Sequence, residues 1–274
     1  MADKTTDPRP ILAITLGDPA GVGPEIILKA LQHAPVYQRA RPLVIGDARI
    51  LQRAAVWLGI QLAPLERVTD PTAGRYTFGQ LALFDLANAS PADCPPGKIS
   101  QAAGRAAVEY VFKACDLAMA HQVDAVVTAP LNKAAMNQAG FHYAGHTELL
   151  TERTHASKVS MLLVGPGLRV VHVSTHVALE EAIRRVTPER VGEVIDLAQH
   201  SCLALGIPQP RIAVAGLNPH ASEGGIFGNQ EETSIMPAVR SARERGLNVS
   251  DPHPPDTVFL RAMKGEFDIV VAMY

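Results

Sequence analysis

The chain has 274 residues, 47% of them hydrophobic and 19% charged, with a formal net charge of −2. This composition is typical of a globular protein with a sizeable core, and no block of like charge indicates a nucleic-acid or anionic-membrane partner. No apolar run approaches the roughly 20 residues that a membrane helix needs, and residues 1–10 lack the apolar core of a signal peptide. The three cysteines are widely spaced, which argues against a disulfide framework and favours a cytoplasmic setting.

Short apolar runs alternate with amphipathic stretches along the chain. Short Val/Ile-rich runs are typical of buried strands, and glycines or prolines mark several helix boundaries. In chain order, the predicted strands are residues 11–16, 43–45, 124–128, 159–164, 168–173, 211–215 and 268–273. The predicted helices are residues 24–31, 48–58, 100–121, 188–205 and 231–245. Residues 62–93, rich in Pro, Gly and Asp, predict short strands within a mobile excursion.

This alternation predicts an α/β fold with a mostly parallel sheet. Only Gly165-Pro166-Gly167 separates two of the strands, which predicts a hairpin and hence one antiparallel element in the sheet. We expect residues 1–274 to form a single catalytic unit of two lobes around this mixed sheet, with the lobe boundaries left open.

Polar residues concentrate where predicted strands end, which is where α/β proteins usually place their sites. His176 follows one predicted strand and His220 follows another, both among small and turn-forming residues. Two imidazoles at adjacent strand ends can approach to metal-ligand distance, and neutral imidazole suits several divalent metals. The alternative is that each histidine caps a strand and bonds to the backbone, so the pattern alone leaves the metal site open.

The glycine-rich turn at residues 17–25 lacks the G-x-G-x-x-G pattern, and its two prolines remove backbone donors. We therefore interpret its glycines as a tight strand-to-helix connection, in which Asp18 is an acid held at a strand end. Lys133 follows another strand and is either an anion-binding group or a solvated lysine. No G-x-S-x-G elbow is present, and the cysteines are more typical of core and loop positions than of nucleophiles.

Six segments in this order resemble the successive motifs of the 4-hydroxythreonine-4-phosphate dehydrogenase family, which acts in vitamin B6 synthesis. They span essentially the whole chain, and their order is more specific than any one motif alone. The segments are residues 17–26, 128–133, 145–148, 175–176, 216–225 and 255–257.

The resemblance implies a fold like that of the isocitrate and isopropylmalate dehydrogenases, and a homodimer with a shared active site. It implies oxidation of a secondary alcohol by NAD or NADP, followed by decarboxylation of the resulting 3-oxo acid. A divalent metal, with Zn, Mg and Co as candidates, would polarise the hydroxyl and stabilise the enolate.

Individual residues match family positions. His146 and Thr147 match substrate-binding positions, and His176 and His220 match two of three metal-ligand positions. The weaker candidates for orienting groups or proton transfer are Asp18, Lys133, Asn218 and Asp256.

The resemblance leaves the substrate open between two branches. One acts on 4-phosphohydroxy-L-threonine in pyridoxal phosphate synthesis, and the other on D-threonate or D-erythronate 4-phosphate in sugar-acid catabolism. Residues 145–150, together with the turn at 18–23, are similar to the second branch. The related aromatic dihydrodiol dehydrogenases share the scaffold but lack the His146-Thr147 pair.

The family pattern continues past Tyr274 with a His-Asp-Gln-Gly segment that supplies the third metal histidine. The lysine, asparagine and arginine for the substrate phosphate follow it, with much of the nicotinamide site. The last predicted strand is apolar and stops at Tyr274 without a polar cap. We therefore expect a longer parent protein that includes this C-terminal part, and no cofactor-binding residue is assigned within the chain.

Two other functions remain as alternatives. A metal-dependent hydrolase would use His176 and His220 to activate water and would act without NAD. A non-catalytic remnant would bind metal or ligand without turnover.

Overall fold

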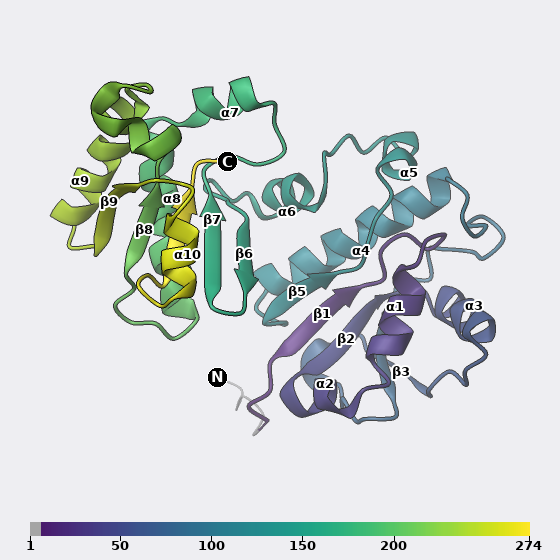
Figure 1. The fold of residues 1–274 in the computed structure, drawn as a ribbon. Coiled ribbons are helices and arrows are strands. Elements are labelled where there is room, and N and C mark those ends of the chain that lie inside the picture. The colour runs from purple at the N-terminus through teal and green to yellow at the C-terminus, as the bar shows by residue number, and fades with distance from the viewer. Residues whose placement is uncertain (1–6) are drawn as a thin grey trace. The chain divides into compact units, whose positions relative to one another are not determined.

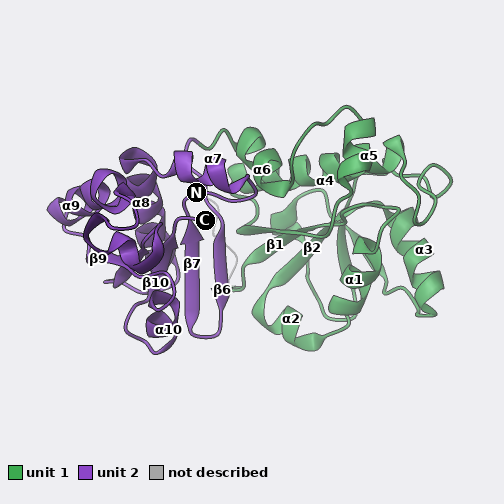
Figure 2. Cartoon of the chain, turned by 45° about the horizontal axis from the view of Figure 1, so that its top comes forward, with its two compact units in different colours: residues 1–156 green, residues 157–274 purple. Residues whose placement is uncertain are grey.

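The computed structural model describes residues 7–274. The chain forms two compact units, residues 1–156 and residues 157–274, each with its own five-stranded sheet (Figures 1 and 2). The sequence predicted one mixed sheet shared by two lobes, and in this respect the prediction was wrong. The α/β class and the dominance of parallel strands are confirmed.

The sheet of the first unit is parallel throughout, with the order β3-β4-β2-β1-β5. β1 lies beside β5, so the carboxyl ends of these two strands meet at one edge of the sheet. The strands are β1 (Ile11–Thr15), β2 (Arg41–Gly46), β3 (Leu65–Arg67), β4 (Leu81–Asp85) and β5 (Ala125–Thr128).

Six α-helices belong to the described part of the first unit, and side-chain caps start three of them. Asp47, Ser100 and Asn132 each accept a hydrogen bond from a backbone N–H of the first turn that follows, as N-cap residues do. The longest helix, α4, packs against β1, β2 and β5 and also contacts α5 and α6. The helices are α1 (Gly23–Ala30), α2 (Ala34–Arg39), α3 (Ala48–Leu58), α4 (Gln101–Met119), α5 (Lys133–Gln138) and α6 (His146–Thr154).

The sheet of the second unit has the order β6-β7-β10-β8-β9 and is parallel except for β6. β6 and β7 form the predicted antiparallel hairpin, in which Gly167 adopts a φ of 74°. The strands are β6 (Leu162–Gly165), β7 (Leu168–His172), β8 (Ile212–Ala215), β9 (Val249–His253) and β10 (Ile269–Ala272).

Alternate residues of the central strands divide the core of this unit into two layers. Ile212 and Val214 of β8 pack in the layer formed with α8 and α9, whereas Ala213 and Ala215 pack in the layer formed with α10. Helices therefore cover both faces of the sheet, as Figure 1 shows for α8 and α10. The α-helices are α7 (Leu179–Arg185), α8 (Pro188–Ala204), α9 (Met236–Glu244) and α10 (Val258–Met263).

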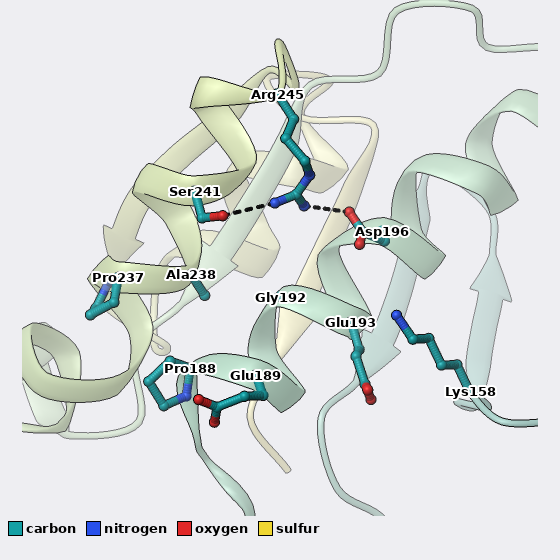
Figure 3. A pocket seen from close by; sticks show the side chains of 10 residues that line it. All are labelled: Lys158, Pro188, Glu189, Gly192, Glu193, Asp196, Pro237, Ala238, Ser241 and Arg245. Atoms are coloured by element: carbon teal, nitrogen blue, oxygen red, sulfur yellow. Dashed lines mark hydrogen bonds and ion pairs between the residues drawn. The ribbon is translucent and has the colours of Figure 1, made fainter.

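Polar contacts join α8 to the end of α9. Arg245 donates hydrogen bonds to Asp196, at 2.6 Å, and to Ser241, at 2.9 Å (Figure 3). These residues line a polar cavity of about 400 Å³ together with Lys158 and Glu193. None of the residues predicted for the functional site lines this cavity.

The predicted strands and long helices are confirmed within a few residues, and the excursion at 62–93 contains β3 and β4. The helix predicted over 231–245 is instead a π-helical turn (Glu231–Ile235) followed by α9. β9 was missed because it is polar and contains Pro252, which an edge strand tolerates. No helix within residues 7–274 combines the length and apolar character that crossing a membrane requires.

Candidate active site

The loops that follow β1 and β5 are in direct contact in the first unit. The backbone N–H of Asp18 donates to the carbonyl oxygen of Pro130, at 2.9 Å. Gly17 adopts a φ of +71°, and a Cβ atom placed there would lie 2.5 Å from the same oxygen. Only glycine satisfies both conditions, so Gly17 allows the two strand ends to meet.

A second glycine of this turn, Gly23, also serves packing within the chain. A Cβ atom on Gly23 would lie 2.3 Å from the carbonyl oxygen of Leu16. The turn therefore brings the strand and α1 close together, as predicted, and these two glycines face the protein's own backbone. This geometry does not fit a cradle for dinucleotide phosphates, which requires glycines that face a ligand.

Asp18 is 6% exposed, and its Oδ1 atom accepts a hydrogen bond from the N–H of Ala20 at 2.8 Å. Burial raises the pKa of this carboxyl, and the hydrogen bond from Ala20 offsets the effect only in part. The side chain is thus bonded to its own turn, which is a structural role. Proton transfer by Asp18 stays a prediction.

Lys133 is exposed at the first position of α5, directly after the N-cap residue Asn132. Asn132 accepts a hydrogen bond from Ala135 at 3.1 Å, which fixes where this helix begins. No ion pair involves Lys133 among residues 7–274, so its ammonium is available for an anion.

His146 is the first residue of α6 and is partly buried. Burial lowers the pKa of its imidazole, although a hydrogen bond with the backbone of Ala129 acts in the opposite direction. The Nε2 atom is buried and has no hydrogen-bond partner within the described chain. An unpaired buried polar atom is costly, so a ligand that bonds to Nε2 would remove this cost.

The first unit thus brings three predicted site residues into one neighbourhood. The backbone N–H of Asp18 is hydrogen-bonded to Pro130, and Lys133 is the third residue after Pro130. The imidazole of His146 lies beside Ala129. Thr147, the next residue of α6, is partly buried, and its carbonyl oxygen accepts from the hydroxyl of Thr151 at 2.6 Å. Asp18, Lys133 and His146 thus lie near the carboxyl ends of β1 and β5.

In the second unit, the two predicted metal ligands follow β7 and β8. The sequence placed them at adjacent strand ends, and this was wrong because β10 lies between the two strands. Strands two places apart are separated by about 10 Å. The end of β10 therefore lies between the histidines, and Ser174 donates from both N–H and Oγ to the carbonyl oxygen of Met273, at 3.2 Å each.

His176 lies in a cavity of about 280 Å³ at this edge of the sheet. The cavity is lined by Ser174, Thr175, His176, Val177, Leu179, Ala182 and Tyr274. The imidazole is exposed, and its backbone adopts a φ of 56°, which is uncommon for a residue with a Cβ atom.

His220 begins a left-handed turn of unusual length. Residues 220–224 all have positive φ, from 43° to 69°, and left-handed conformations cost roughly 1–2 kcal/mol for each non-glycine residue. Such strain persists only where the surroundings impose it, and it is concentrated at functional sites. His220 is exposed, and its ring lies 6.0 Å from that of Phe227.

The donor set at this edge is partial. No group of three His, Cys, Asp or Glu side chains able to hold a metal occurs within residues 7–274. His176 and His220 are exposed imidazoles on either side of β10, with donor chemistry suited to a divalent cation. Each histidine has the chemistry of a metal ligand, and a complete coordination sphere needs further ligands.

Asp256 also lies beyond a strand end in the second unit. It is exposed in the turn between β9 and α10, where the N–H of Thr257 donates to the carbonyl oxygen of Pro254 at 3.2 Å. β9 runs parallel to β8, so Asp256 follows a strand that ends at the same edge as β8.

Asn218 is held by a residue that the sequence did not reveal. The side-chain amide nitrogen of Asn218 donates to Glu231, at 2.9 Å, and to Gln230, at 2.8 Å. Glu231 is buried, whereas its neighbour Glu232 is exposed. Nothing in the sequence distinguishes these two glutamates, because a helix was predicted where the structure has a π-helical turn.

Comparison with known proteins identifies the family of the chain. The family model described as pyridoxal phosphate biosynthetic protein PdxA matches residues 38–274. The D-threonate 4-phosphate dehydrogenase of Cupriavidus necator is 45% identical over 270 residues, covering 98% of this chain and 80% of that protein. The 4-hydroxythreonine-4-phosphate dehydrogenase of Desulforapulum autotrophicum is 42% identical over 272 residues, covering 98% and 79%.

A solved structure gives the same result for the fold. The crystal structure of a 4-hydroxythreonine-4-phosphate dehydrogenase from Burkholderia phymatum superimposes with a TM-score of 0.89 at 46% identity, covering 98% of this chain and 81% of that one. These matches confirm the resemblance seen in the motifs. The chain belongs to the family of the pyridoxal phosphate biosynthetic protein PdxA.

Proposed function

We propose that this protein is an NAD- or NADP-dependent dehydrogenase that oxidises a 4-phosphorylated hydroxy acid and decarboxylates the product. The observation that carries the proposal is the match, over 98% of the chain, to relatives named as dehydrogenases of two such substrates. The strand-end residues support it, because they bring imidazole, ammonium and carboxylate groups to the carboxyl edges of the two sheets.

The two relatives define two substrate candidates, D-threonate 4-phosphate and 4-phosphohydroxy-L-threonine. Both carry a phosphate at C4, a hydroxyl at C3 and a carboxylate at C1. They differ at C2, which bears a hydroxyl in the first and an ammonium in the second. A single site can therefore perform the same chemistry on both, and the contacts at C2 decide between them.

In the reaction, hydride leaves C3 for the nicotinamide and the hydroxyl proton passes to a base. The 3-oxo acid then loses its carboxylate as carbon dioxide, and the electron pair of the broken C1–C2 bond forms an enolate that takes up a proton at C2. Lys133 is an exposed ammonium that suits anion binding or proton transfer, and Asp256 is an exposed carboxylate that suits proton transfer. His146 suits a polar group of the substrate because its Nε2 atom is unpaired. No residue is assigned to the nicotinamide cofactor, and the glycine turn after β1 does not fit the phosphates of a dinucleotide.

A divalent metal is part of the proposal, with His176 and His220 as two of its ligands. When bound, it would polarise the substrate hydroxyl and stabilise the negative charge that develops on that oxygen. The two histidines would hold it at the edge of the sheet on either side of β10. A homodimer with a shared site, as the family resemblance implies, would supply further groups.

The test is reduction of NAD or NADP by the purified protein with zinc, magnesium or cobalt. The panel contains D-threonate 4-phosphate, D-erythronate 4-phosphate and 4-phosphohydroxy-L-threonine, with unphosphorylated threonate as the control. We expect reduced nicotinamide and carbon dioxide in equal amounts from one phosphorylated substrate. Phosphate release without NAD would indicate the hydrolase alternative, and binding without turnover would indicate a non-catalytic protein.

A further inference from the structure

Glu231 is a buried carboxylate that holds the backbone beyond β8. It is 5% exposed, and its Oε1 atom accepts hydrogen bonds from the N–H groups of Leu217, at 2.8 Å, and Asn218, at 2.7 Å. Burial alone would raise its pKa, but the hydrogen bonds from Asn218 and Leu217 outweigh burial and lower it. The group is therefore an ionised carboxylate at neutral pH.

The second oxygen of Glu231 determines how the Asn218 amide is turned. An ionised carboxylate only accepts hydrogen bonds, so the atom that faces it at 2.9 Å must be the NH₂ group of Asn218. The same nitrogen donates to the Oε1 atom of Gln230, at 2.8 Å. Both amide protons are thus engaged inside the loop, and the carbonyl oxygen Oδ1 is turned away from Glu231.

Gly228 closes the loop over this amide. Its φ is 129°, and a Cβ atom there would lie 2.8 Å from the amide nitrogen of Asn218. By contrast, the Oδ1 atom of Asn218 has no hydrogen-bond partner within residues 7–274. This unpaired oxygen is not buried. Solvent therefore reaches Oδ1 at the carboxyl end of β8, two residues before His220.

We propose that Glu231 is a positioning residue that fixes Asn218 with its carbonyl oxygen outward, so that the site presents a hydrogen-bond acceptor here. The inference rests on the proposed function, and the group it would recognise is a donor on the substrate, a hydroxyl of the hydroxy acid. An acceptor at this point favours an alcohol over the corresponding ketone, because a ketone has no proton to donate.

The substitution Glu231→Gln tests the proposal because it replaces the acceptor oxygen that faces the Asn218 amide by a donor NH₂ group. The introduced glutamine keeps an oxygen for the two backbone N–H groups but turns an NH₂ group toward Asn218. The amides of Asn218 and Gln230 must then both flip, since otherwise two acceptors would face each other, and Asn218 presents its own NH₂ group to the substrate. We expect KM to rise about tenfold, the effect of losing one hydrogen bond, with a smaller change in kcat.

A second variant restores the acceptor. In the double variant Asn218→Asp with Glu231→Gln, one oxygen of the introduced aspartate accepts from the introduced glutamine and the other stays outward. We expect KM to return to within about threefold of the wild-type value, a recovery that general damage to the fold would not produce. Glu232→Gln is the matched control, because Glu232 is exposed and pairs with Arg240 at the surface, so KM should not change.

The amide orientation is also measurable without turnover. In NMR spectra, the side-chain NH₂ signals of Asn218 are identified by their loss in Asn218→Asp. We expect their exchange with water to become at least about tenfold faster in Glu231→Gln, because the NH₂ group then faces solvent. Unchanged exchange and unchanged KM, or no recovery in the double variant, would overturn the proposal. If the wild-type protein reduces NAD with no substrate of the panel, the proposed function fails, while the exchange measurement still decides the role of Glu231.

Discussion

Gly104 in α4 faces the carbonyl oxygen of Ala135 in α5 so closely that a Cβ atom on Gly104 would lie 2.0 Å from that oxygen. The contact is with backbone, which cannot rotate aside as a side chain can. Since α5 begins with Lys133, this contact sets how near the helix that carries a candidate site residue lies to α4. Gly104 is therefore required for packing, although glycine is unfavourable inside a helix.

The substitution Gly104→Ala should lower the free energy of unfolding by about 2 kcal/mol. Overpacking costs about 1–3 kcal/mol. Because the contact at Gly104 is very close, we expect a cost at the upper end of that range. The better helix propensity of alanine returns at most about 1 kcal/mol. Urea unfolding measures the difference.

Gly192→Ala provides the matched control, because Gly192 also lies inside a helix, where α8 faces α9 (Figure 3). Its Cβ atom would lie 4.0 Å from the Cβ atom of Ala238, an ordinary contact. This substitution should raise stability by up to about 1 kcal/mol. If both substitutions changed the free energy of unfolding equally, the close approach of Ala135 to Gly104 would not affect stability.

The buried carboxylate of Asp47 should make the stability of the protein depend on pH. It is 1% exposed, and it accepts hydrogen bonds from the side chain and N–H of Arg49 and from the N–H of Ala89. Burial alone would raise the pKa of Asp47, but these hydrogen bonds outweigh burial and lower it. A lowered pKa in the folded state stabilises the protein above the unfolded value of about 3.9, and the stabilisation is lost as pH falls through the folded pKa.

Asp47→Asn should therefore destabilise the protein at pH 7, and its difference from the wild type should shrink as pH is lowered below about 4. Urea unfolding of both proteins across this range measures the difference. Asp93→Asn serves as the control, since Asp93 is exposed and the change should stay within about 0.5 kcal/mol. A difference between Asp47→Asn and the wild type that does not vary with pH would contradict the assignment.

Asp18→Asn separates a structural from a catalytic role. Burial raises the pKa of Asp18, which means that the charged form is disfavoured in the folded protein. Asparagine keeps an oxygen for the N–H of Ala20 and removes the buried charge, so we expect higher stability at pH 7. Because Asp18 is almost fully buried, we expect kcat to stay within about tenfold. A fall of about 10²-fold or more, the range of general acid–base catalysis, would instead assign proton transfer to Asp18.

The sequence predicted where the strands are better than it predicted which strands lie side by side in a sheet. Val- and Ile-containing runs identify β8 and β10, whose residues are buried along the whole strand. Strand order depends on contacts between distant segments, so the position of β10 between β7 and β8 was not predictable from local pattern. For the same reason, the histidines were expected at adjacent strand ends and are not.

The polar segments show a second limit. α6 contains His146 and Thr147, yet it was not predicted, because only Leu149 among its residues is buried and its pattern lacks an apolar stripe. Glu231 was missed for a different reason. Its role depends on a π-helical turn that directs its carboxylate toward the backbone after β8. No residue pattern predicts such a turn.

The metal site gives the last prediction. If His176 and His220 are ligands, His176→Gln and His220→Gln should each weaken cobalt or zinc binding by at least about 10²-fold, because a remaining imidazole cannot hold the ion alone. Isothermal titration calorimetry measures the affinity directly. His200→Gln is the control, because His200 is also exposed in the second unit but bonds to the carbonyl oxygen of Asp196 on α8. Loss of affinity in only one of the two variants would show that the ion is held on one side of β10, and unchanged affinity in both would remove the histidines from the site.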